Sequence, residues 1–587
     1  MCADSARSDA KMRRFSSLSD RSWKPYFLLI ASASSSASIE SSPSPSPNSG
    51  ASGSIPSGCT PSRFRLSTSS CASSCSAGLC ADIGCFQCGG DDGGNDPRSA
   101  GPAQPAAAPR RAPSIMPRMT VPDPAATASA DSIAHPDVLV IGGGPAGSTI
   151  ATLLARKGWQ VTMLEKDRHP RFHIGESLLP MNMPILERLG VLEQVRGIGV
   201  LKLGADFPVD DGSYNGFPFK RALGDSPGYA FHVKRAEFDQ LLFEHARGEG
   251  VDARDNVRVE RVELDDGATL VHARGEHGTL RFRPRYLVDA SGRDAFLGGR
   301  LGLKRRNPRH ASAALFSHYT GVERRPGDDA GNVSIIRHEH GWLWLIPLRD
   351  GVTSVGAVCT PEYLKQRRGD SEAFLQQTLE SVPAAAERMR GAKRVAPVHA
   401  TGNYAYDCSR MSGPGWMLLG DAWTFVDPMF SSGVFLAMNS AELGAGAVDT
   451  LLREPAREAA LMAALEKRLS RGLDELKWFI YRFTSPTMKS LFSRPRNVLQ
   501  VEQAVISMLA GDVFDAPAVR WRLRLFRLIY AFGTLKTAPQ AWRAWRERKR
   551  QPAVAFGGDT LQADPPAAPR AGTGTRGFEP GDAEAVR

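Results

Sequence analysis

The chain has 587 residues, which is more than one simple hydrophobic core covers and predicts two or more domains. Its 42% hydrophobic and 23% charged residues are typical of a globular protein, and no run approaches the roughly 18 apolar residues of a membrane-spanning helix. The net charge of +11 suits nucleic acid, anionic lipid or an acidic protein as a partner, but zinc-finger spacings and recognisable nucleic-acid motifs are missing. We expect no nucleic-acid partner, no stable membrane insertion and a cytoplasmic location.

Residues 1–134 are rich in serine and poor in large apolar residues, and this composition predicts a disordered low-complexity extension. Seven of the nine cysteines lie before residue 90, among them the pair Cys85-x-x-Cys88. Neither a histidine nor a second such pair completes a metal site there, so we expect no metal. The apolar run within the extension is too short and too late for a signal peptide. Translation from Met116 or Met119 is a simpler hypothesis for this segment.

An α/β pattern begins at residue 135 and runs to about 450. Residues 451–550 have the apolar periodicity of helices. The tail, residues 551–587, is rich in proline, alanine and glycine and is expected to be disordered.

Residues 137–167 predict a dinucleotide-binding unit. A buried strand is followed by the glycine turn Gly142-x-Gly144-x-x-Gly147, a helix and a second strand that ends at Glu165. The glycines allow a tight turn and a close approach of the backbone, so that a pyrophosphate can sit at the helix N-terminus. The carboxylate of Glu165 is placed to bind ribose hydroxyls.

Two later stretches resemble the flavoprotein family of aromatic hydroxylases and related oxidoreductases. They are YLVDASG (286–292) and GWMLLGDAWTFVDPMFSSGVFLAM (415–438). The resemblance implies that FAD is the cofactor. It also implies that Asp421, in the Gly-Asp pair, binds the ribityl chain of FAD. It also places Arg235, in VKRAEFDQLL, beside FAD; the alternative for Arg235 is a surface salt bridge at a helix start.

Three further segments resemble the flavin-dependent halogenases. They are FHIGESLLP (172–180), VLKLGADF (200–207) and GWLWLIP (341–347), and the likeness runs from about residue 137 to 530. It includes WFIYRFTSPTMKSLFSRPRN (478–497), which is similar to the C-terminal helices of halogenases that act on phenolic or carrier-bound substrates.

The resemblance implies an α/β fold: a Rossmann-like FAD-binding domain over residues 135–450, with an interleaved β-sheet substrate domain and a helical C-terminal region over 451–550. The substrate part is expected at about 205–235 and 305–400. The implied reaction uses reduced FAD (FADH2), O2 and chloride or bromide.

In GWLWLIP, residues Trp342, Trp344 and Ile346 point to one side if the segment is a strand. A hydroxylase brings its substrate to the oxygen that reduced flavin activates, whereas a halogenase lets halide alone reach it. The resemblance therefore makes the two tryptophans a partition between cofactor and substrate. The alternative is an ordinary core strand.

The resemblance also makes Lys202 the group that captures hypohalous acid beside the substrate, a role that an apolar pocket favours because burial leaves more free amine. Glu176 and Ser177, in the Gly-Glu-Ser segment, join the catalytic candidates. Halide is expected near Ser432 and Gly433, where a helix begins; the alternative is a serine N-cap, and both can hold together.

The glutamate that assists lysine in tryptophan halogenases has no clear equivalent, which favours a phenol or a pyrrole-like ring, free or on an acyl-carrier protein. No second GxGxxG stands in the α/β part, so a separate flavin reductase is expected as a partner. An FAD-dependent hydroxylase, a geranylgeranyl-reductase-like flavoprotein and a binding module without catalysis are the alternatives.

Residues 520–550 carry ten arginines and lysines against one acid, with Trp521, Leu525, Leu528 and Phe532 at helical spacing. The first interpretation is a helix that packs by this apolar stripe and exposes a basic face. The others are a dock for an acidic carrier protein and a membrane surface.

Overall fold

The computed structural model describes residues 132–209, 212–265, 268–367, 369–493 and 495–536. The expected disorder of residues 1–131 and 551–587, the Cys85–Cys88 pair and the basic residues after 536 lie outside these ranges.

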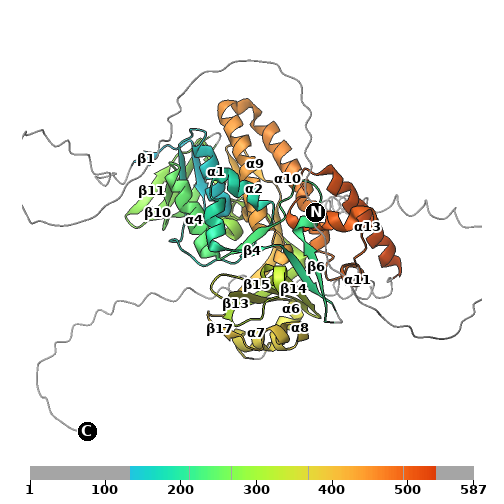
Figure 1. Cartoon of the computed structure of the whole chain (residues 1–587). Helices are drawn as coiled ribbons and strands as arrows, with labels where there is room; N and C mark the ends of the chain where they lie inside the picture. The colour runs from blue at the N-terminus through green and yellow to red at the C-terminus, as the bar shows by residue number, and fades with distance from the viewer. Residues whose placement is uncertain (1–131, 210–211, 266–267, 368, 494, 537–587) are drawn as a thin grey trace, which may run out of the picture. The chain divides into compact units, whose positions relative to one another are not determined.

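A six-stranded sheet forms the nucleotide-binding layer (Figure 1). Five of its strands run parallel, and β2, β3 and β12 are buried at every position, as expected for short strands covered on both faces. Helix α1 packs against α4 and α9. The strands are, in sheet order, β19 (Ser412–Gly413), β20 (Trp416–Leu418), β12 (Tyr286–Asp289), β2 (Val138–Ile141), β3 (Val161–Leu164) and β8 (Asp252–Arg254); the helices are α1 (Pro145–Ala155), α4 (Arg235–Gly248) and α9 (Gly433–Arg453).

A nine-stranded sheet carries the GWLWLIP segment, which forms β15 as expected. Trp342, Trp344 and Ile346 belong to the main core on one face, while Leu343 and Leu345 pack into a separate cluster with helices on the other face. Figure 1 shows α6, α7 and α8 on that second face. The strands are β21 (Thr424–Phe425), β18 (His399–Cys408), β13 (Lys304–Thr320), β16 (Val352–Cys359), β15 (Gly341–Pro347), β14 (Val333–His338), β5 (Gly204–Pro208), β6 (Tyr214–Pro218) and, at the side, β17 (Lys393–Arg394); the helices are α6 (Pro361–Leu364), α7 (Ser371–Glu380) and α8 (Pro383–Arg388).

A four-stranded sheet corrects one expected boundary. Its strand β1 (Ile133–Ala134) runs parallel to β11. Residues 133 and 134 therefore belong to the folded part of the chain, although the sequence analysis expected the disordered extension to continue to residue 134. The backbone hydrogen bonds of these two residues give the segment a fixed place that composition did not reveal. The other strands of this sheet and of a two-stranded ribbon are β11 (Gly278–Phe282), β10 (Ala268–Gly275), β9 (Arg258–Asp265), β4 (Gly199–Lys202) and β7 (Ala230–Val233).

Helices follow one another after residue 433, and α9 crosses the domain boundary expected at 450; the division into domains stays a prediction. Among the described residues, no helix is long and apolar enough to cross a membrane. The remaining helices are α2 (Asn182–Leu189), α3 (Leu192–Ile198), α5 (Phe296–Arg300), α10 (Glu458–Ile480), α11 (Pro486–Ser493), α12 (Val501–Ala510) and α13 (Pro517–Lys536), with short 3-10 turns such as η4 (Gly420–Ala422) and η5 (Pro428–Phe430).

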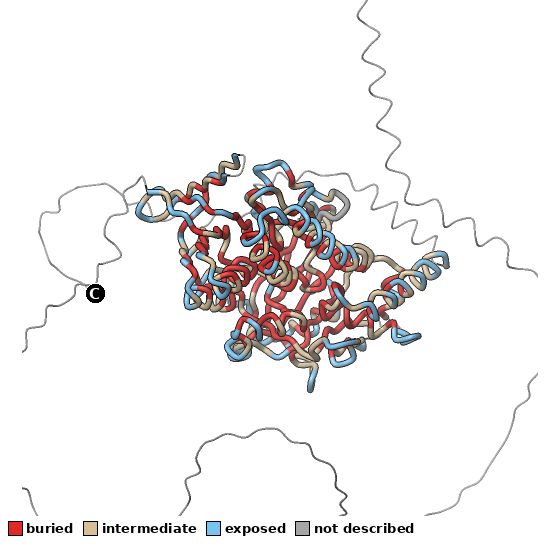
Figure 2. The backbone as a smooth tube through the Cα atoms, turned by 90° about the horizontal axis from the view of Figure 1, so that it is seen from above, coloured by how far each residue is buried: buried red, intermediate tan, exposed pale blue. Residues whose placement is uncertain are grey.

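Helix α13 packs by the opposite face from the expected one. Trp521, Leu528 and Phe532 are 44%, 57% and 58% exposed, whereas Leu523 and Phe526 are buried. Figure 2 colours the described backbone by burial in the same way. The expected packing is therefore wrong for Trp521, Leu528 and Phe532, whereas Leu525 of the same stripe is partly buried and packs against the core. The helix has two apolar stripes, and its contacts with α11 and α12 bury the other one.

Candidate active site

A cavity of about 340 Å³ lies where the carboxyl ends of β2, β3, β12 and β20 meet the tryptophan-bearing face of β15. Ligands of open α/β sheets bind at this edge. Of the expected site residues, the following line the cavity: Gly142, Gly144, Glu165, Glu176, Ser177, Arg235, Trp342, Trp344, Asp421 and Gly433. Gly147, Lys202 and Ser432 are not part of this lining.

Each of the three positions of the turn requires glycine for a different structural reason. Gly142 has φ +102°, and a Cβ on it would stand 2.5 Å from the carbonyl oxygen of Ala290. A Cβ on Gly147 would overlap the carbonyl oxygen of Gly142. At Gly144 the nearest atom would be Nη2 of Arg171, 3.5 Å away, because this position faces the cavity. Gly142 and Gly147 therefore shape the turn, and Gly144 leaves space for a ligand at the N-terminus of α1.

Glu165 is held at the end of β3 by two backbone donors. Its carboxylate accepts hydrogen bonds from the N–H groups of Gly143 (2.8 Å) and Asp167 (3.1 Å). The guanidinium of Arg171 lies 3.3 Å from the same carboxylate and also bonds Asp239. Arg171 lies outside the motifs quoted from the sequence, and a basic residue seven positions after a strand carried no signal of its own.

Arg235 is 6% exposed. The alternative of a salt bridge at the surface is therefore wrong, because the ion pair of Arg235 is buried. Its guanidinium makes two hydrogen bonds to Asp239, at 2.8 and 3.0 Å, and one to the carbonyl oxygen of Ile174, at 2.8 Å. Burial by itself would raise the pKa of Asp239, but Arg235 and Arg171 lower it below its ordinary value. The ion pair is therefore a buried, charged support for the loop 174–177 at the cavity.

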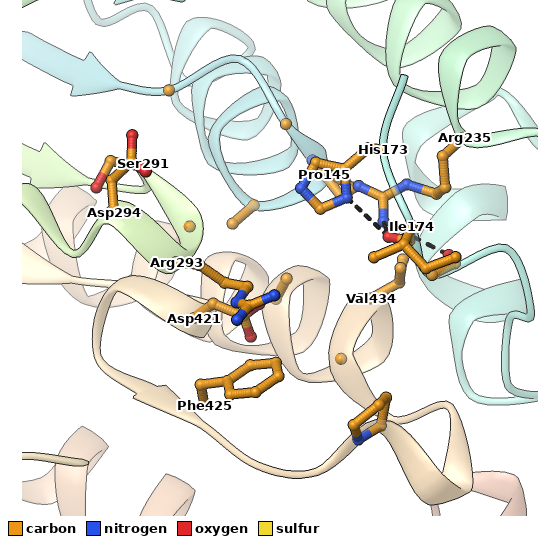
Figure 3. A pocket seen from close by; sticks show the side chains of 18 of the residues that line it. Pro145, His173, Ile174, Arg235, Ser291, Arg293, Asp294, Asp421, Phe425 and Val434 are labelled. Carbon is orange, nitrogen blue, oxygen red and sulfur yellow. Dashed lines mark hydrogen bonds between the residues drawn. The ribbon is translucent and has the colours of Figure 1, made fainter. Parts of the chain in front are cut away.

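Asp421 lies in η4, directly after β20, and lines the cavity. Burial raises the pKa of its carboxyl group to about 6, against the opposing effect of Arg293 and Arg235. Figure 3 shows Arg293 beside Asp421. Arg293 is itself fixed by a 2.7 Å hydrogen bond to Oγ1 of Thr401 and by the ring of Phe425. The sequence analysis missed Arg293, although it directly follows the YLVDASG segment.

These features suit a dinucleotide cofactor. The cradle at Gly144 would be filled by a side chain larger than glycine, and the N-terminus of α1 favours a pyrophosphate. Glu165 and Asp421 are acceptors for hydroxyl groups, and the arginines balance negative charge. The other end of the cavity is apolar, with Trp342, Trp344, Ile346 and Phe316, and suits a planar ring system.

The tryptophans of β15 form one wall of this apolar end. Trp342 and Trp344 are 4% and 6% exposed, and their ring centroids lie 5.8 Å apart. The indole N–H of Trp344 donates to Oγ of Ser354 at 3.1 Å. A Cβ on Gly356 would overlap the Trp344 ring, so the strand β16 leaves room for this side chain and no more.

Lys202 ends strand β4 and is 1% exposed. Its ammonium group donates to Oγ of Ser177 at 2.9 Å and to the carbonyl oxygen of Leu178 at 3.0 Å. Burial lowers the pKa of this amine to about 7. Ser177 lines the cavity, and Lys202 lies behind it, so the hydroxyl group stands between the cavity and the amine.

The expected halide loop turns sharply before α9. Ser431 has a left-handed backbone with φ +55°, and Ser431 and Gly433 line the cavity, while Ser432 is buried. Ser432 occupies the N-cap position, but its hydroxyl group makes no capping hydrogen bond, so the serine N-cap alternative is wrong in this respect. Of the two residues expected for halide, Gly433 therefore lines the cavity and Ser432 does not, and its neighbour Ser431 does.

Glu176 is buried and faces the cavity, and its Oε1 accepts a 2.7 Å hydrogen bond from Nε2 of His318. His318, on β13, is a further residue that the sequence analysis did not find. Among the described residues, no group of three or more histidine, cysteine or acidic side chains could hold a metal ion.

The chain is similar to known flavoproteins. The FAD binding domain family model matches residues 135–477. The chain is 36% identical over 398 residues to tryptophan 2-halogenase of Chondromyces crocatus, covering 64% of this chain and 74% of that protein. It is 28% identical to a 1H-pyrrole-2-carbonyl-[peptidyl-carrier protein] chlorinase of Pseudomonas fluorescens, covering 65% and 90%. The solved structure of the flavin-dependent brominase Bmp2 superposes with a TM-score of 0.60 at 26% identity, covering 67% of this chain and 99% of that chain.

The FAD binding domain model spans more than half of the chain, and the tryptophan 2-halogenase is 36% identical and covered to 74% of its length. The chain therefore belongs to the flavin-dependent halogenases and is an FAD-dependent oxidoreductase.

Proposed function

We propose that the enzyme halogenates an electron-rich aromatic ring of the phenol or pyrrole type, free or tethered to an acyl-carrier protein, with reduced flavin from a separate reductase. The carrier-bound pyrrole of one relative supports the substrate class. The sequence supports the reductase: the letters GxGxxG recur at Gly572–Gly577, but without the preceding apolar strand of a nucleotide site.

FAD, when reduced, supplies two electrons that activate O2. Gly144 and the N-terminus of α1 would hold the pyrophosphate, Glu165 would hold the adenosine ribose, and Arg235 and Asp421 would contact the rest of the cofactor. The backbone of residues 431–433 offers N–H donors to halide at the start of α9. Trp342 and Trp344 keep the aromatic substrate away from the cofactor cavity.

The observation that carries the proposal is the buried amine of Lys202 behind Ser177. Because burial lowers its pKa to about 7, a substantial fraction is free amine near neutral pH. The amine reacts with hypohalous acid, forming an N–X bond and releasing water. The aromatic carbon then takes the halogen, and the ring proton leaves, which restores the amine. Ser177 accepts a hydrogen bond from Lys202, so its own O–H can point to the cavity and guide the acid inward.

The test compares Lys202→Met with Lys234→Met, a matched loss of a lysine that pairs with Asp350 at the surface. With reductase, NADPH and halide, we expect Lys202→Met to lose aryl halide by about a hundredfold or more. A diffusible phenol trap should still be halogenated, and Lys234→Met should resemble wild type. An unchanged rate for Lys202→Met would remove the lysine from the reaction.

The substrate class is tested separately with a phenol, a carrier-bound pyrrole and free tryptophan, followed by mass spectrometry. A preference for tryptophan would overturn the substrate class. Oxygenated product without halide dependence would overturn halogenation.

A further inference from the structure

Glu176 and His318 form a pair that connects the cofactor cavity to the partly exposed end of the interior strand β13. Glu176 is 1% exposed and lines the cavity, and it belongs to the loop between β3 and α2. Its Oε1 is 2.7 Å from Nε2 of His318, while its buried Oε2 has no hydrogen-bond partner in the part of the chain that the structure describes. An unsatisfied buried carboxylate oxygen is costly, and its retention indicates use by a ligand or a proton.

The charge of a carboxylate, rather than the distance, sets the direction of this hydrogen bond. An ionised carboxylate only accepts, so Nε2 of His318 carries the hydrogen and Nδ1 is left as the basic nitrogen. The His318 side chain is 18% exposed, against 1% for Glu176, so the histidine is the outer member of the pair. Its ring lies 6.2 Å, centroid to centroid, from that of Phe172, which is 48% exposed.

Halogenation needs a proton inside this cavity. The balanced reaction is ArH + X⁻ + H⁺ + O2 + FADH2 → ArX + FAD + 2 H2O. Halide enters as an anion and leaves in a neutral carbon–halogen bond, so each turnover consumes one proton from solvent. The tryptophan wall of the cavity is apolar and carries no proton, and the hydrogen bonds of Lys202 go to Ser177 and Leu178.

We propose that Glu176 and His318 are a proton relay that delivers this proton from solvent to the cofactor cavity. The proposal rests on the proposed halogenation. A proton from solvent binds Nδ1 of His318, and the Nε2 proton passes to Oε1 of Glu176. The carboxyl group then rotates, which turns the protonated oxygen toward the cavity, and releases the proton there to become a carboxylate again. Loss of the Nδ1 proton to Nε2, by ring turnover or through water, restores the pair. His318 is a positioning and relay residue, and Glu176 is the member that faces the reacting groups.

The surroundings of the pair leave this route intact. From β18, His399 faces His318, and its pKa is lowered by burial and by that neighbour. From β16, His318 is opposite the neutral Ser354. From β17, Lys393 and Arg394 pair with the two residues that follow His318 on β13 and are exposed. From α4, Arg235 lies 3.5 Å from the carbonyl oxygen of Gly175, next to Glu176, and is occupied by Asp239.

The experiment uses the FAD-loaded enzyme with a reductase and compares His318→Ala, Glu176→Gln and the control His272→Ala. His272 makes the same kind of contact, 3.0 Å from Oε1 of Glu263, in the separate four-stranded sheet. We expect His318→Ala to lower the halogenation rate by about tenfold to a hundredfold, with unchanged FAD affinity by fluorescence titration. Added imidazole should restore most of this rate. Glu176→Gln should be equally slow and insensitive to imidazole, and His272→Ala should match wild type.

A second measurement needs no turnover. In protein without cofactor, labelled with 15N-histidine, His318 should show its hydrogen on Nε2 in a strong hydrogen bond, and Glu176→Gln should weaken that signal. A His318→Ala enzyme with wild-type rate, or a slow one that imidazole does not rescue, would overturn the relay. If wild type makes no halogenated product, the proposed function fails, whereas the NMR result still decides whether the pair holds its proton as described.

Discussion

At the residue scale, a substitution at Gly144 should affect ligand binding without affecting the stability of the fold. An aspartate there puts a carboxylate where the pyrophosphate approaches, while the space at this position admits a Cβ. We expect Gly144→Asp to keep its thermal unfolding midpoint without flavin and to lose FAD binding. The control Gly147→Ala should instead lose stability, because its Cβ overlaps the backbone of Gly142. Fluorescence titration with FAD and thermal unfolding measure both, and normal FAD retention by Gly144→Asp would contradict the assignment.

The buried amine of Lys202 gives stability a predictable pH dependence. The ordinary pKa of lysine is 10.5, and burial lowers that of Lys202 to about 7. Between these values the unfolded chain binds one more proton at this site than the folded chain, so the free energy of unfolding rises with pH, by up to about 1.4 kcal/mol per pH unit. Lys202→Met lacks this contribution. Urea denaturation from pH 6 to 9 should show wild type gaining stability relative to the variant above pH 7; parallel curves would contradict the burial.

At the element scale, β15 presents different side chains to its two faces. Trp344 borders the cofactor cavity, and Leu343 packs against helices on the other side. Trp344→Ala should open the wall, so that oxygenated aromatic by-product and hydrogen peroxide appear beside the halogenated product. Leu343→Ala is the matched control: it should lose about 2–5 kcal/mol of stability without changing the products. Mass spectrometry of the products and a peroxide assay decide, and a clean product from Trp344→Ala would count against the partition.

Two alanine variants of helix α13 show which of its two apolar stripes is buried. Leu523→Ala should lower the thermal unfolding midpoint markedly, since Leu523 is fully buried, with a loss of about 2–5 kcal/mol. Leu528→Ala, on the 57% exposed side chain, should change stability by about 0.5 kcal/mol or less. The reverse order would favour the face that the sequence pattern alone indicated.

At the scale of the whole molecule, the supply of electrons comes from outside the chain. We expect the purified protein with FAD to leave NADPH unoxidised and to form halogenated product when a flavin reductase is added. The change in NADPH absorbance at 340 nm, with and without an aromatic substrate, checks this. Rapid NADPH oxidation by the protein alone would show a nicotinamide site of its own.

The sequence by itself determined the local parts of this protein. The strand–turn–helix unit at 138–155 and the strand at 341–347 were predictable because glycine spacing and alternation act between near neighbours. The quoted motifs also contain most of the residues that line the cavity, because ligands approach the sheet at glycine turns and strand ends.

Tertiary structure decided what depends on distant contacts. Arg171, Arg293 and His318 lie outside any motif used, and they join the site because β3, β12 and β13 end or cross beside it. The sequence did not determine which face of α13 is buried, because the helix has two stripes of similar apolarity. Packing against α11 and α12 decides which stripe is buried. The depth of Lys202 follows from the strand pair β4–β7 and the loop of Ser177 closing over it, which no spacing along the chain encodes.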